Sequence, residues 1–176
     1  MTQHTPTPPL PAAYVDTCVV SARVKDELQN LERAAVDRMI DLFRSRCITL
    51  VRSSHVEDEI AAIPDAYRAP HEALLSTFIS VPSVEVGGLT RLTGMGTSGA
   101  SPRRMLWNRL ARILRDEGDR WHVFTAAQNR MRYLVTVDQR TILNHRLEIQ
   151  AASGVLPLLP SAFIKSIWPL PTRDDA

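Results

Sequence analysis

The stretch AAYVDTCVV, residues 12–20, is apolar and rich in β-branched side chains, and Asp16 is its one charged residue. A nearly continuous apolar run of this length is typical of a strand covered on both faces, as in parallel sheets. Further runs of this kind predict strands at CITLVR (47–52), VPSVEV (81–86), YLVTV (133–137) and VLPLL (155–159).

Segments suited to helices lie between these runs, several of them with apolar residues at helical spacing. The predicted helices are 26–44, 54–63, 66–79, 103–117, 119–132 and 139–147, and a last helical turn begins at Pro160. Gly118 is expected to break the chain between the fourth and fifth of these, with Asp119 as the N-cap of the fifth. The alternation of strands and helices predicts an α/β domain of three layers around a mostly parallel central sheet.

The length of 176 residues leaves room for one domain. We assign it to residues 12–166, between a Pro/Thr-rich tail at 1–11 that should be disordered and a C-terminal tail at 167–176. Segment 87–102 holds five of the seven glycines and is expected to be a flexible loop.

Composition excludes several classes of protein. The 21 Lys and Arg residues against 19 Asp and Glu give a net charge of +2, too small by itself to indicate nucleic-acid binding. The two cysteines have the spacing of neither a disulfide framework nor a zinc site, which favours a cytoplasmic location. No apolar run approaches the roughly 20 residues of a membrane span, and the N-terminus lacks the pattern of a signal peptide.

Two aspartates end predicted strands. Asp16 follows AAYV, and Asp138 follows YLVTV, with Thr136 two residues before it. In open parallel sheets, ligands bind beyond the carboxyl ends of the strands, so adjacent strands would bring both carboxylates into one pocket. The alternative is that each is a turn or cap residue, since Asp favours both positions.

Two further acids, Glu59 and Asp119, lie at or near the starts of predicted helices. Ser54 and Glu57 fit a capping box, which accounts for Glu57. Glu59 lies on the flank of the buried stripe of the same helix, where it needs either a partner arginine, such as Arg52 or Arg23, or a functional role.

The fourth acid, Asp119, has a plain interpretation as an N-cap, but capping does not prevent metal binding because a carboxylate has two oxygens. His122 lies three residues later on the same helical face. A histidine in this position is more often a packed, hydrogen-bonded residue than a ligand.

Taken in order, these motifs resemble the PIN-domain nucleases over residues 12–166. An Asp-Thr pair ends the first strand at Asp16 and Thr17, and a Ser precedes a Glu by five residues at Ser54 and Glu59. A DxxH helix start then leads to a TxD strand end in DRWHVFTAAQNRMRYLVTVDQRTILN (119–144), and VLPLLPSAFIKS (155–166) is similar to the last strand and helix of the family. The 87–102 loop is longer than in small family members.

The resemblance implies a PIN-like α/β/α fold and an endoribonuclease that depends on one or two Mg²⁺ or Mn²⁺ ions. The residues that would bind metal and carry out catalysis are Asp16, Glu59, Asp119 and Asp138. The residues that would support them are Thr17, Ser54, His122 and Thr136. Carboxylate oxygens are hard ligands that suit these ions, and the acids would otherwise repel one another. The resemblance also implies an RNA substrate, a homodimer and the role of toxin in a toxin–antitoxin pair, with an antitoxin protein as partner.

Without the four acids, the count becomes 21 basic against 19 − 4 = 15 acidic residues. Arg103, Arg104, Arg109 and Arg112 are concentrated on or just before one helix, where they would contact RNA phosphates. The alternative is an ordinary solvated helix face.

Two other classes of protein are alternatives to a PIN-like nuclease. A catalytically silent PIN-like module would bind RNA or a protein without cutting, although all four acids of the pattern are present. A different α/β enzyme is disfavoured, because the chain contains no GxGxxG, GxxxxGK[ST] or GxSxG motif. A receiver domain would need a lysine at a strand end, and Lys25 and Lys165 are poorly placed.

Overall fold

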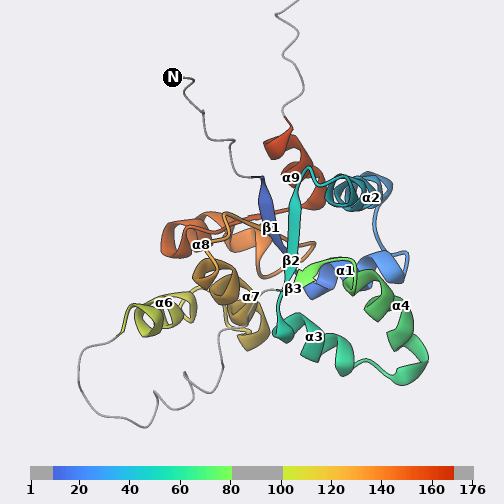
Figure 1. The fold of residues 1–176 in the computed structure, drawn as a ribbon. Helices are drawn as coiled ribbons and strands as arrows, with labels where there is room; N and C mark the ends of the chain where they lie inside the picture. Colours follow the sequence, from blue (N-terminus) through green and yellow to red (C-terminus); the bar gives the residue numbers. More distant parts are fainter. Residues whose placement is uncertain (1–9, 81–100, 169–176) are drawn as a thin grey trace, which may run out of the picture.

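The computed structural model describes residues 10–80 and 101–168. Its centre is a five-stranded sheet of order β3-β2-β1-β4-β5, in which every neighbouring pair is parallel (Figure 1). The strands are β1 (Ala12–Val15), β2 (Thr49–Arg52), β3 (Ile79–Ser80), β4 (Tyr133–Val135) and β5 (Leu156–Leu158). The predicted α/β class with a parallel sheet is confirmed.

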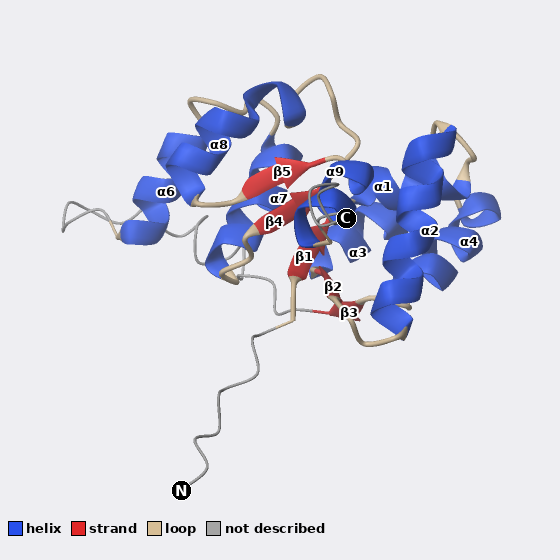
Figure 2. Cartoon of the chain, turned by 90° about the horizontal axis from the view of Figure 1, so that it is seen from above, coloured by secondary structure: helices blue, strands red, loops and turns tan. Residues whose placement is uncertain are grey.

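Helices cover both faces of the sheet. They are α1 (Thr17–Val24), α2 (Asn30–Arg44), α3 (Ser54–Ala61), α4 (Asp65–Leu75), α6 (Pro102–Leu110), α7 (Glu117–Gln128), α8 (Arg146–Ser153) and α9 (Pro160–Ile167). One layer contains α6, α7 and α8, and the other contains α1, α2, α4 and α9 (Figures 1 and 2). The arrangement is consistent with the three-layer α/β/α prediction.

The core forms where these layers meet the sheet. Tyr14, Leu50 and Leu134, one from each of the three central strands, are completely buried. Phe124 of α7 and Phe163 of α9 are also fully buried. Burial on both faces explains why the strands read as apolar runs rather than as alternating patterns.

Strand β5 forms one edge of the described sheet, and Pro157 lies at its centre, in register with Leu134 of β4. Proline has no backbone N–H, so within sheets it is tolerated mainly on edge strands. The proline therefore agrees with the observed strand order.

The apolar run 12–20 is a strand only in its first part, which ends before Asp16 as the strand-end interpretation of that residue predicted. Strand β1 ends at Val15, and Cys18, Val19 and Val20 belong to helix α1. The cause is Asp16, whose side chain accepts a hydrogen bond from the Cys18 N–H and caps the new helix. The buried valines face the core from a helix, and an apolar run alone does not distinguish this from a strand.

The predicted caps of two helices also need correction. Asp116, and not Asp119, caps α7, because its Oδ1 accepts from the Asp119 N–H at 3.1 Å. Gly118 lies in the first turn of α7 and does not separate two helices. The Ser54–Glu57 capping box is absent: Ser53 occupies the N-cap of α3 and makes no side-chain capping bond.

The predicted helix 103–117 ends already at Leu110, and the predicted helix 139–147 is displaced to a 3-10 turn, Leu143–His145, followed by α8. The remaining boundaries differ by a few residues. The predicted strand 81–86, residues 87–100 of the glycine-rich loop, and the tails at 1–9 and 169–176 lie outside the described residues. Within the described ranges, no helix combines the length and the apolar composition needed to cross a bilayer.

Candidate functional site

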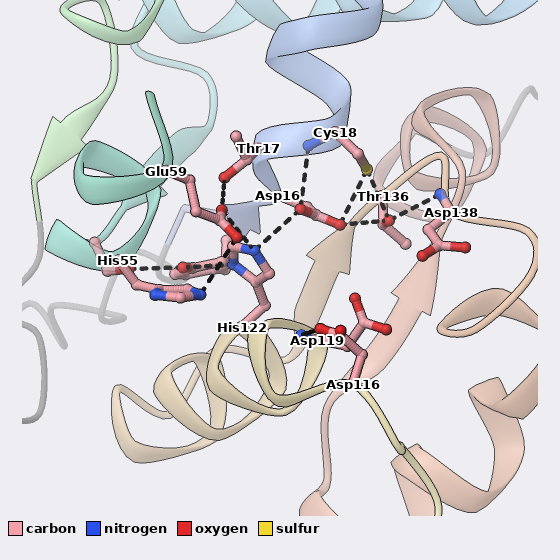
Figure 3. Close-up of polar contacts among 12 residues, drawn as sticks. Asp16, Thr17, Cys18, His55, Glu59, Asp116, Asp119, His122, Thr136 and Asp138 are labelled. Atoms are coloured by element: carbon pink, nitrogen blue, oxygen red, sulfur yellow. Dashed lines mark hydrogen bonds and ion pairs between the residues drawn. The ribbon is translucent and has the colours of Figure 1, made fainter. Parts of the chain in front are cut away.

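Asp16 lies at the carboxyl end of β1 and is 4% exposed. Its Oδ2 accepts from the Thr136 hydroxyl at 2.7 Å and from the Cys18 thiol at 3.0 Å (Figure 3). Its Oδ1 accepts from the Cys18 N–H at 3.2 Å and lies 3.3 Å from His122 Nε2. Burial and the charge of Asp16 raise the pKa of Cys18, so the thiol keeps the proton that it donates. These contacts hold the carboxylate in one orientation.

Thr136 connects Asp16 to Asp138, because its oxygen also accepts from the Asp138 N–H at 3.1 Å. The Asp138 carboxylate accepts from the N–H groups of Arg140 and Thr141, at 2.8 and 3.0 Å, and from the Thr141 hydroxyl. Asp138 is therefore a turn residue, as one interpretation of the sequence predicted, and it also lies at the edge that Asp16 occupies.

Asp119 reaches the same edge from the first turn of α7 (Figure 3). Burial raises the pKa of Asp119, a hydrogen bond with Thr141 offsets part of that rise, and the charges of Asp138, Asp116 and Asp16 add to it. Crowding of carboxylates disfavours ionisation of all of them together unless a cation or a proton compensates. This part of the site is therefore short of positive charge.

Glu59 lacks the arginine partner that one interpretation required. Arg52 pairs with Glu57, and Arg23 pairs with Asp37 at 2.9 Å. Neither candidate arginine therefore explains the position of Glu59.

The partners of Glu59 are instead a hydroxyl and two imidazoles. Its Oε2 accepts from the Thr17 hydroxyl and lies 3.1 Å from His122 Nε2, and its Oε1 lies 3.5 Å from His55 Nε2. Burial alone would raise the pKa of Glu59, but the hydrogen bond and charge of His122, together with Thr17, lower it. The Glu59 carboxylate therefore faces His122, the imidazole that Asp16 also contacts.

His122 is buried between Asp16 and Glu59 (Figure 3). Burial would lower the pKa of its imidazole, but the nearby carboxylates, Asp16 first, raise it. The imidazole lies between two of the four acids and contacts both of them. The sequence analysis predicted only a supporting role for His122, whereas it contacts both Asp16 and Glu59.

Tyr14 and Ser53 complete the network and were not predicted. The Tyr14 hydroxyl lies 2.7 Å from Ser53 Oγ and 3.1 Å from His122 Nδ1, and burial raises the pKa of the phenol. The serine of the network is thus Ser53, at the end of β2, and the predicted Ser54 is the first residue of α3. Tyr14 therefore orients His122 through the ring nitrogen that faces away from the carboxylates.

His55 was also missed. Its ring centroid lies 4.8 Å from that of His122, and burial and the charge of His122 lower its pKa. In the described part of the chain, His55, Glu59 and His122 form the one group of three or more metal-ligating side chains whose ligand atoms all lie within 4.8 Å of one another. The four carboxylates form no group as tight as this.

The predicted RNA-binding arginines lie on the surface of the helical layer that contains α6. Arg103, Arg104 and Arg109 belong to α6 and Arg112 follows it, and all four are exposed. Arg109 also donates to the Ala152 carbonyl at 3.0 Å. Helix α6 packs against α7, the helix that carries Asp119 and His122.

Comparison with known proteins does not assign this chain to a family. A scan against protein-family models finds no match to this chain, and a search of curated proteins finds none either.

Thr136 offers a test of the network. We expect Thr136→Val to lower the free energy of unfolding by about 1–3 kcal/mol, because Asp16 and the Asp138 N–H each lose a buried partner without a change in side-chain shape. The matched control is Thr49→Val in β2, which is half-buried and should change it by less than about 0.5 kcal/mol. Urea unfolding measures both; equal effects would contradict the assigned role of Thr136.

Proposed function

We propose that this chain is a divalent-metal-dependent endoribonuclease of the PIN type. The observation that carries the proposal is one continuous polar network at the carboxyl ends of β1 and β4, to which α3 and α7 also contribute. This is the edge at which open parallel sheets bind ligands. The four acids of the network are Asp16, Glu59, Asp119 and Asp138.

The donor set suits Mg²⁺ or Mn²⁺, because all four side chains are carboxylates, and oxygen ligands are those that hard cations prefer. The raised pKa of Asp119 among Asp138, Asp116 and Asp16 supports the same idea, since a cation there would relieve their repulsion. A divalent cation, when bound, supplies Lewis acidity and activates water for attack on a phosphodiester. One or two ions would be held by the four acids.

The remaining residues position these acids. Thr136 fixes Asp16 relative to Asp138, Thr17 holds Glu59, and His122 keeps Asp16 and Glu59 facing each other. Because Thr136 and His122 are themselves buried, little rotation is left to the groups they hold. Preorganised carboxylates of this kind bind a reacting phosphate without further rearrangement.

We further propose that RNA lies along the exposed arginines of α6, whose guanidinium groups suit phosphate oxygens. A homodimer and a role as the toxin partner of an antitoxin belong to the same proposal and rest on the resemblance alone, and a cytoplasmic location rests on the cysteine content. A catalytically silent module is the alternative; the presence of all four acids favours the enzyme.

The test is cleavage of a single-stranded RNA by the full chain with Mg²⁺ or Mn²⁺. We expect cleavage that EDTA abolishes, and Glu59→Gln should slow it by about 10²-fold or more, because the variant keeps the shape and removes a charge worth several kcal/mol. Asp58→Asn, its exposed neighbour on α3, is the matched control and should cut normally.

Two results would contradict the proposed nuclease activity. The wild-type chain with either metal could bind the RNA and leave it intact, which is the behaviour of the silent module. Alternatively, Glu59→Gln could cut as fast as Asp58→Asn, in which case the cleavage arises elsewhere.

A further inference from the structure

A second ligand set lies beside the carboxylates and has a different chemistry. His55 and Glu59 are four residues apart on α3, so their side chains leave the same face of the helix. His122 approaches this pair from α7 (Figure 3). Two imidazoles and one carboxylate are the donors that zinc receives in several open, three-ligand protein sites.

The distances fit a small tetrahedral ion. Bonds of about 2.0–2.1 Å from zinc to nitrogen or oxygen place neighbouring ligand atoms about 3.3 Å apart. Here His122 Nε2 lies 3.1 Å from Glu59 Oε2, and His55 Nε2 lies 3.5 Å from Glu59 Oε1. The two distances end on different oxygens of Glu59, and one ligand atom from each of the three residues lies within 4.8 Å of the others, so the side chains close in around an ion when it binds.

Two features favour metal binding by these imidazoles, of which His122 shares its Nε2 with Asp16 and Glu59 until an ion binds. His55 Nε2 is buried and has no hydrogen-bond partner, an arrangement that costs free energy unless something binds it. His122 is held through its other nitrogen, Nδ1, by Tyr14, which in turn contacts Ser53. Metal-binding histidines are almost always oriented in this way by a partner on the second nitrogen.

Gly118 borders this group of side chains. A Cβ atom at this position would lie 3.5 Å from Glu59 Oε1, 3.8 Å from His55 Nε2 and 3.1 Å from Asp116 Oδ1. A side chain at position 118 would therefore crowd Glu59, His55 and Asp116, which the glycine avoids.

From these observations we propose that His55, Glu59 and His122 bind one Zn²⁺ ion, leaving a fourth position open. The borderline donors select Zn²⁺ over Mg²⁺, which prefers oxygen ligands. The site shares Glu59 with the proposed nuclease centre but does not depend on nuclease activity.

The test is Zn²⁺ binding by the metal-free full chain, measured by calorimetry in a large excess of Mg²⁺. We expect one Zn²⁺ per chain and a loss of affinity of about 100-fold or more in His55→Asn. His145→Asn is the matched control, because His145 lies far along the chain and pairs with Glu148 instead. Gly118→Ala should also weaken binding; its φ is not positive, and alanine favours the helix, so the fold is kept.

X-ray absorption at the zinc edge of the wild-type chain gives a readout that requires no variant, and two imidazole ligands are expected. Absence of stoichiometric binding, a spectrum without two imidazoles, or unchanged affinity in His55→Asn would each overturn the zinc site. Asp138→Asn separates the two proposals. It should keep Zn²⁺ binding while RNA cleavage is lost, so either proposal can fail while the other stands.

Discussion

Asp16→Asn is expected to reduce metal-dependent RNA cleavage by about 10³-fold, the largest loss among single substitutions at the site. Asp16 is the carboxylate that contacts both Thr136 and His122. It therefore links the part of the network around Asp138 to the part around Glu59. Several kcal/mol of electrostatic stabilisation disappear with it, and each 1.4 kcal/mol is a factor of ten in rate.

The variant should still fold, because asparagine caps helices about as well as aspartate, and the capping bond to Cys18 in α1 can be kept. Circular dichroism checks this, and initial cleavage rates measure the effect. Asp41→Asn on the exposed side of α2 is the matched control and should cut at the wild-type rate. Equal rates for the two variants would place the reaction away from Asp16.

The largest effect on stability is expected at Leu134. This residue is fully buried in β4, paired with Tyr14 on one side and Pro157 on the other. Leu134→Ala should lower the free energy of unfolding by about 2–5 kcal/mol, since it leaves a cavity that the surrounding strands fill only in part. Leu147→Ala, at a position that is 69% exposed, is the control, and urea unfolding compares the two. A loss below about 1 kcal/mol at Leu134 would show that the core relaxes around it.

Much of the fold follows from local pattern. The apolar runs mark where strands lie, and a polar residue directly after a run marks the carboxyl end, which is why Asp16 and Asp138 could be placed at one edge. Glu59 could be singled out because its helical position borders the buried face while its neighbour Asp58 is exposed.

The partners of these acids could not be found in the same way. Tyr14 meets Ser53 across 39 residues of sequence and His122 across 108, and no local pattern encodes such contacts. His55 carried a usable signal, since a histidine four residues before a glutamate on a helix places two metal ligands on one face.

The predicted starts of the helices were wrong for a different reason. The sequence DEGD at 116–119 offers two aspartates at capping distance from one helix, and only the bond from the Asp119 N–H to Asp116 decides between them. A glycine between them suggested a break, although it occupies an ordinary helical position in the first turn of α7.

The proline at the centre of β5 has a consequence for self-association. A second molecule that tried to extend the sheet by adding a strand along β5 would find no amide hydrogen at Pro157, in the middle of the three-residue strand. Strand addition along this edge is therefore disfavoured, and this side of the molecule is protected against the edge-to-edge stacking that leads to fibrils.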